Sequence, residues 1–102
     1  MQDDVLLQYL KTACAGKKSL RSGKSLQNTF RISGNELRRR IHRLRCRGLP
    51  IAANRDGYFY AETAGELYAT IRQLEKLRSG VEAAIRGLEA AMDKFGVSEG
   101  SR

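Results

Sequence analysis

Apolar residues recur at alternating steps of four and three along the last third of the sequence. The positions are Leu67, Ile71, Leu74, Arg78, Val81, Ile85, Leu88 and Met92. A heptad sustained over more than three repeats is typical of a helix that packs lengthwise against another helix. A helix from 64 to 94 would be roughly 48 Å long, which is more than a domain of about sixty residues can cover. The pattern therefore predicts a long helix that needs a partner.

The ends and the middle of this helix carry further cues. Thr63 and Glu66 form a capping box at its start, and Ser79-Gly80 is a candidate kink or break. Two arrangements remain open: residues 81–95 fold back on 64–78, or two copies form a coiled coil. We favour the homodimer, parallel or antiparallel, in which an inward Arg78 would set the register. The predicted dimer contacts are Leu67, Ile71, Leu74, Leu77, Arg78, Val81, Ile85, Leu88 and Met92.

A second helix is predicted over residues 33–47. Ser33 and Glu36 form another capping box, and Leu37, Ile41 and Leu44 make a narrow apolar stripe. Gly48 suits the C-terminal cap and Pro50 prevents continuation. This helix also carries six arginines between 38 and 47, and a helical wheel places most of them outward.

Shorter elements surround this basic helix. The spacing of Leu6 and Leu10 predicts a first helix, capped by Asp3 or Asp4 and ending near residue 15. Residues 16–23 read as a basic loop, and 24–30 as a short helix. Residues 50–53 and 58–60 are two short extended runs, and the intervening NRDG predicts a hairpin.

Charge is divided unevenly along the chain. Residues 1–61 carry 13 Lys and Arg against 4 Asp and Glu, whereas residues 62–102 carry 6 against 7. Basic charge confined to one part indicates a partner-facing region, and a nucleic acid is the partner it favours. We therefore expect three regions: a basic domain over 1–61, a helical dimerisation segment over 62–95 and a disordered tail over 96–102.

The predicted order of elements resembles the winged helix-turn-helix family of DNA-binding domains over residues 3–61. The resemblance lies in Ser25-Leu26, in RISGNELRRRIHRLRCRG as a recognition helix, and in LPIAANRDGYFY as a wing. The phrase from Ile32 to Ile51 is also similar to small winged-helix proteins of bacterial prophages. The resemblance implies a mainly α fold with a small β-hairpin, followed here by a long coiled-coil-like helix.

This resemblance divides the basic residues by role. In such proteins the outward, N-terminal part of the recognition helix approaches base edges in the major groove. The residues in that part are Asn35, Arg38, Arg39, His42 and Arg43. Phosphate contacts, which position without specifying sequence, are expected from Arg40, Arg45, Arg47, Lys17, Lys18, Arg21 and Lys24. Arg55 at the hairpin tip is expected to touch the backbone or the minor groove. The alternative for the helix is a solvated charged face, which we disfavour because acids are scarce nearby in the sequence.

Other chemistry finds little support. His42 and Cys46 share a face, but a metal site needs more ligands, so no metal or other cofactor is expected. Cys46 is a candidate oxidant sensor, with an inert thiol as the favoured alternative. A single histidine and the absence of a nucleophile motif or a phosphate-binding Gly-rich loop argue against an enzyme. Two free cysteines and no apolar stretch of membrane length indicate a cytoplasmic protein without a membrane partner.

The sequence thus predicts a dimeric protein that binds double-stranded DNA, with full or partial sequence specificity. A transcriptional regulator or replication accessory of phage type fits that description. The alternative is a protein-interaction module or small inhibitor, for example an anti-CRISPR, that acts on a host nucleic-acid-processing complex.

Overall fold

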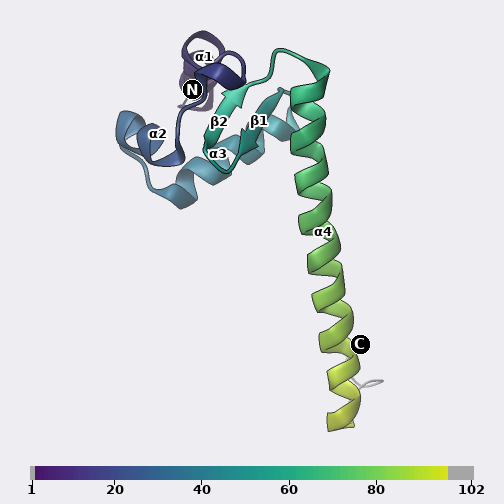
Figure 1. The fold of residues 1–102 in the computed structure, drawn as a ribbon. Helices are drawn as coiled ribbons and strands as arrows, with labels where there is room; N and C mark the ends of the chain where they lie inside the picture. Colours follow the sequence, from purple (N-terminus) through teal and green to yellow (C-terminus); the bar gives the residue numbers. More distant parts are fainter. Residues whose placement is uncertain (1, 97–102) are drawn as a thin grey trace. The chain divides into compact units, whose positions relative to one another are not determined.

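The computed structural model describes residues 2–96, which form two compact units divided after Thr70. In chain order the elements are α1 (Gln2–Ala13), the 3-10 helix η1 (Lys17–Ser19), α2 (Gly23–Phe30), α3 (Gly34–Cys46), β1 (Ile51–Asn54), β2 (Gly57–Tyr60), α4 (Ala64–Met92) and the 3-10 helix η2 (Asp93–Phe95) (Figure 1). The prediction of a mainly helical chain with one hairpin and a long C-terminal helix is confirmed. The predicted tail lies, beyond Gly96, outside the described residues.

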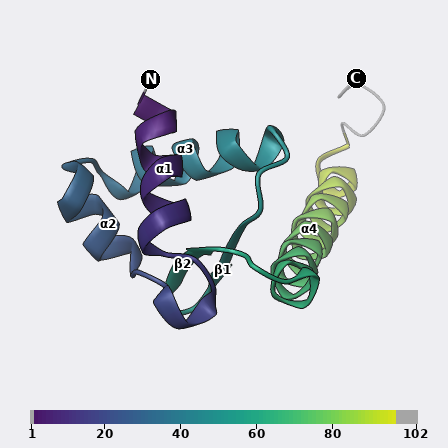
Figure 2. The same ribbon diagram turned by 90° about the horizontal axis from the view of Figure 1, so that it is seen from above.

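The first unit has one apolar core, to which α1, α2, α3, β1 and β2 contribute. In Figure 2, α1 crosses α3, and α2 lies beside one end of α3. Residues from these helices and the hairpin are buried together: Leu6, Leu10, Cys14, Leu26, Leu37, Ile41, Leu44, Ile51, Ala52 and Phe59. The predicted stripe of α3 therefore faces the core, and burial of its three aliphatic side chains stabilises the unit by about 1.5–3 kcal/mol each.

Side-chain caps begin the helices of this unit. The Ser33 hydroxyl accepts a hydrogen bond from the Glu36 amide at 3.1 Å, as predicted, and Ser22 caps α2 in the same way. The prediction that Asp3 or Asp4 caps α1 is wrong, because α1 already includes both residues in its first turn. Arg31 ends α2 in the left-handed conformation, with φ of 54°.

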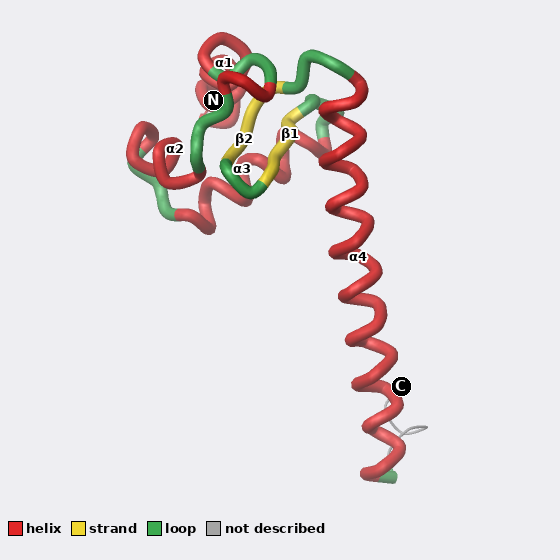
Figure 3. Tube along the Cα trace, in the orientation of Figure 1, coloured by secondary structure: helices red, strands yellow, loops and turns green. Residues whose placement is uncertain are grey.

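The hairpin pairs Ile51 with Tyr60 and Asn54 with Gly57 in antiparallel register (Figure 3). The segment preceding α2 is more ordered than the loop predicted for it, because its backbone lines the outer edge of β2. Arg21 exchanges two backbone hydrogen bonds with Tyr58, at 2.9 and 3.0 Å. Gly16 donates to the Tyr60 carbonyl and Tyr60 donates to the Cys14 carbonyl, each at 2.8 Å. These bonds satisfy the edge of a two-stranded sheet that would be marginal alone.

Helix α4 runs through Ser79 and Gly80 without a break, so the arrangement in which residues 81–95 fold back is wrong. Thr63 caps the helix by accepting the Glu66 amide at 3.1 Å, while the Glu66 carboxylate accepts the amides of Glu62 and Lys17. Thr70 is buried, and its hydroxyl accepts the Ala53 amide at 3.0 Å. The first turns of α4 are therefore part of the first unit. None of the described helices combines the length and apolar character that a membrane span needs.

Candidate nucleic-acid interface

Two of the six arginines between residues 38 and 47 serve the interior of the first unit. The helical wheel placed Arg40 and Arg45 on the outward flanks as phosphate contacts, and that placement is wrong. Arg40 is 8% exposed and its Nε donates to Glu36 Oε2 at 3.0 Å. Arg45 is half-buried and its Nε donates to the Ile51 carbonyl at 2.9 Å. Burial lowers the pKa of the Arg45 guanidinium. Both long side chains fold over the core because their aliphatic stems can cover apolar surface.

The side of α3 opposite the core carries five exposed residues, which we call the outer face: Asn35, Arg38, Arg39, His42 and Cys46. The Arg38 guanidinium donates to Asn35 Oδ1, and Arg39 donates to Glu36 Oε1 at 3.2 Å. His42 Nε2 and Cys46 Sγ are 3.5 Å apart. Each arginine of the outer face therefore donates to a residue three positions earlier in the chain. Several hydrogen-bonding groups of this face remain available to solvent.

Acids from α1 lie against the flank of α3 that carries Arg43 and Arg47. Arg43 donates to both carboxylate oxygens of Asp3, at 2.7 and 2.9 Å, and Arg47 lies 3.4 Å from Asp4. The Arg43 hydrogen bonds hold the pKa of Asp3 below its ordinary value, and Asp3 in turn raises the pKa of Arg43. The expectation that α3 lacks nearby acids is therefore wrong, because these carboxylates are about forty positions away in sequence.

The remaining predicted contacts lie on three other segments. Arg55 is exposed at the hairpin turn, which Asn54 braces by accepting the amides of Asp56 and Gly57. Lys17 and Lys18 lie on η1 and Lys24 on α2, and all three are exposed. Arg21 is exposed too, but its guanidinium lies over the Tyr9 ring and donates to the Tyr9 hydroxyl at 3.2 Å.

Sequence reasoning did not name Arg31 as a candidate. It is exposed and forms the turn between α2 and α3, next to the start of the outer face. A helical wheel of α3 could not include it because it precedes that helix. Its position as the only cation in the short connection was the available indication.

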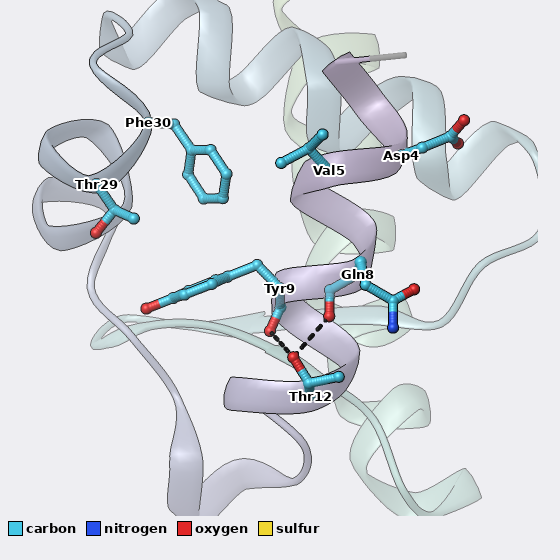
Figure 4. Close-up of a pocket in the computed structure, with 7 residues that line it drawn as sticks. All are labelled: Asp4, Val5, Gln8, Tyr9, Thr12, Thr29 and Phe30. Atoms are coloured by element: carbon cyan, nitrogen blue, oxygen red, sulfur yellow. Dashed lines mark hydrogen bonds between the residues drawn. The ribbon is translucent and has the colours of Figure 1, made fainter.

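A shallow groove lies between α1 and α2 (Figure 4). Tyr9 and Phe30 meet edge to face in it, with ring centroids 5.4 Å apart. The Thr12 hydroxyl donates to the Gln8 carbonyl at 2.9 Å. Its single carboxylate, Asp4, gives it no paired acid and base. Within residues 2–96, no group of three or more His, Cys, Asp or Glu residues is placed to hold a metal ion.

The two cysteines differ in environment. Cys14 is buried in the core, and burial raises the pKa of its thiol. Cys46 is exposed on the outer face beside His42. A protonated, enclosed thiol is inert, so only Cys46 is open to chemical modification.

Comparisons with protein-family models, with curated proteins and with solved structures found no match.

Proposed function

We propose that the first unit is a winged helix-turn-helix domain that binds double-stranded DNA through the outer face of α3. The observation that carries the proposal is the outer face itself, where Asn35, Arg38, Arg39 and His42 stand exposed on the N-terminal two-thirds of one helix. A helix follows another across a short turn and leads into a two-stranded hairpin, which is the order of elements that the family uses.

The side chains of the outer face suit base edges in the major groove. An arginine can donate two hydrogen bonds to guanine, and an asparagine amide can both donate a hydrogen bond to adenine and accept one from it. Arg38 and Asn35 already hydrogen bond to each other, so contact with bases would exchange that bond for two external ones. Arg39 would likewise leave Glu36, and an exposed ion pair of this kind contributes little to stability.

Phosphate contacts are assigned to exposed cations outside this face. Arg31 at the α2–α3 turn and Arg55 at the hairpin turn are exposed, and so are Lys17, Lys18 and Lys24. Arg43 and Arg47 are already paired with Asp3 and Asp4, so they add less to the attraction. Arg40 and Arg45 are assigned no contact with DNA because both are engaged inside the unit.

Two copies of the chain, joined through α4, would present two such domains to one duplex. The exposed stripe on α4 supports this dimer, because Ile71, Leu74, Val81, Ile85 and Leu88 are all more than 40% exposed in a single chain. A monomeric soluble protein seldom leaves a continuous apolar surface of that extent uncovered.

The test is fluorescence anisotropy with a labelled random-sequence duplex at two salt concentrations. We expect affinity to fall steeply with salt, since binding releases counterions from phosphates. Arg39→Ala and Arg38→Ala should each weaken binding several-fold. Lys76→Ala is the matched control, since it removes one exposed charge from α4 and should leave affinity unchanged. Binding that ignores salt, or that falls equally in the control, would count against the proposal.

A second candidate function is a protein-interaction module, in which this face meets an acidic protein surface. The carboxylates of Asp3 and Asp4 favour a protein over DNA, because they repel the uniformly negative backbone of a duplex, whereas a protein surface can also present cations to them. A pull-down from nuclease-treated host lysate separates the two functions. A specific partner that survives nuclease, combined with no binding to DNA, would replace the first proposal.

A further inference from the structure

The apolar stripe of α4 between Ile71 and Leu88 is bordered by two unlike rows of residues. Glu75, Glu82 and Glu89 lie along one border. Leu77, Ala84 and Ala91 lie along the other. Arg78 occupies the centre of the stripe, four positions before Glu82. Within residues 2–96, neither Arg78 nor Glu82 takes part in an ion pair, so both remain available to a second chain.

A parallel pair of these helices would place unlike groups against each other. Each heptad position then faces its own copy, so Arg78 would lie opposite Arg78 in the interior of the pair. Buried like charges are strongly unfavourable. The glutamate border of one helix would run along the Leu77 border of the other, so Glu82 would face Leu77 and no interhelical ion pair would form.

An antiparallel pair matches all six positions of the stripe at once. A two-fold axis between Ser79 and Gly80 sets Ile71 against Leu88 of the second copy, and Leu74 against Ile85. In the same register Arg78 lies level with Val81 of the second copy. Ile71, Leu74, Ile85 and Leu88 then each find an apolar partner, Val81 lies against the aliphatic stem of Arg78, and neither end of the stripe is left uncovered.

Each border faces the same border of the second copy in that register, so the two borders make different contacts. On one side Leu77 lies near Ala84 of the second copy, so a large side chain meets a small one and the helices can approach closely. On the other side, Arg78 lies next to Glu82 of the second copy, because their levels differ by one residue, about 1.5 Å along the axis. Glu75 of the first chain lies two residues, about 3 Å along the axis, from the level of Glu82 of the second copy, so Arg78 lies close to both carboxylates and offsets their repulsion. The two-fold axis repeats this arrangement.

We infer that α4 binds α4 of a second copy in antiparallel orientation, with its centre at Ser79–Gly80 and with Arg78 paired to Glu82 of that copy. The inference rests on the proposed homodimer and is independent of DNA binding. The two winged units then leave the paired segment at opposite ends.

Thiol crosslinking distinguishes the orientations. In a Cys46→Ser background, which removes the exposed native thiol, Ile71→Cys and Leu88→Cys are made as separate chains. In the antiparallel register the two Ile71 positions are 17 residues apart along the axis, about 25 Å, whereas Ile71 and Leu88 of opposite chains are level. A short thiol-to-thiol crosslinker should therefore link the mixed chains and link neither chain to itself.

The crosslinking results distinguish a parallel pair, an antiparallel pair and a monomer. Crosslinking of Ile71→Cys to itself shows a parallel pair and overturns the inference while leaving the dimer intact. If no sample crosslinks and sedimentation of the unmodified protein shows a monomer, the inference and the dimer both fail, and the DNA titration still tests the outer face of α3 separately. Leu74→Cys with Ile85→Cys is a second level pair, in case the first pair weakens association.

A charge exchange tests the register. Arg78→Glu alone should weaken association at least ten-fold, because the new glutamate of each chain then lies beside Glu82 of the other chain. Arg78→Glu mixed with Glu82→Arg should restore the affinity to within about three-fold of wild type. Equal affinity for the single variant and the wild-type protein would show that Arg78 does not meet Glu82.

Discussion

Gly57 is the position at which the fold leaves least room, and its replacement by alanine is a sharp test of how the hairpin is held. A Cβ atom at Gly57 would lie 2.1 Å from the Arg21 carbonyl oxygen and 2.9 Å from Ser22 Cα. Carbon and oxygen atoms in ordinary contact are separated by about 3.5 Å, so the backbone of residues 21–22 must move by more than an ångström.

That movement disrupts the two Arg21–Tyr58 backbone hydrogen bonds. Each contributes about 1 kcal/mol net, and the overpacking itself costs about 1–3 kcal/mol. Alanine recovers about 0.4–1 kcal/mol through the unfolded chain. The free energy of unfolding should therefore fall by about 3 kcal/mol, which corresponds to roughly 12–24 °C in Tm for a chain of this size.

Thermal unfolding followed by near-ultraviolet circular dichroism of the tyrosines measures this change. Gly65→Ala is the matched control, because its nearest neighbour is the Thr63 hydroxyl at 3.9 Å and alanine favours a helix by up to about 1 kcal/mol. If Gly57→Ala unfolds within about 2 °C of wild type, or the control falls as far, then residues 14–22 do not hold the outer edge of β2 as described.

Three further predictions concern single contacts. Arg31→Gly should raise the free energy of unfolding, measured by urea titration, by up to about 1 kcal/mol, because Arg31 holds a left-handed φ of 54° that glycine adopts more easily. The same substitution removes a cation beside α3, so it should also weaken DNA binding. Thr70→Val should lower it by about 1–3 kcal/mol, since the Ala53 amide loses its acceptor, whereas Thr70→Ser keeps the hydroxyl and should cost less; equal losses would refute that role for the hydroxyl. Because the pKa of Asp3 is lowered in the folded protein, its ion pair adds stability above about pH 4, and this stability is lost as the pH falls through the lowered pKa. Asp3→Asn should therefore flatten the acid side of a curve of unfolding free energy against pH. An unchanged slope would contradict the Asp3–Arg43 pair.

The sequence by itself determined the features that depend on neighbours a few residues apart. The serine cap of α3, the Asn54–Gly57 turn and the helical spacing of the apolar residues of α4 each depend on residues close in the chain. Such contacts follow from spacing, since the geometry of a helix or a two-residue turn fixes which side chains meet.

Tertiary packing alone decided which arginines remain on the outer face. Arg40 and Arg45 turned inward because the core surface beside α3 covers their stems, and Arg43 met Asp3 because α1 crosses α3. A helical wheel treats a helix as if one side faced a uniform interior, so it cannot say which neighbouring element supplies an acid or a carbonyl. Residues 14–22 line β2 for a related reason. The edge strand of the hairpin has backbone N–H and C=O groups that need hydrogen-bond partners, and no local pattern in residues 14–22 indicates that they supply them.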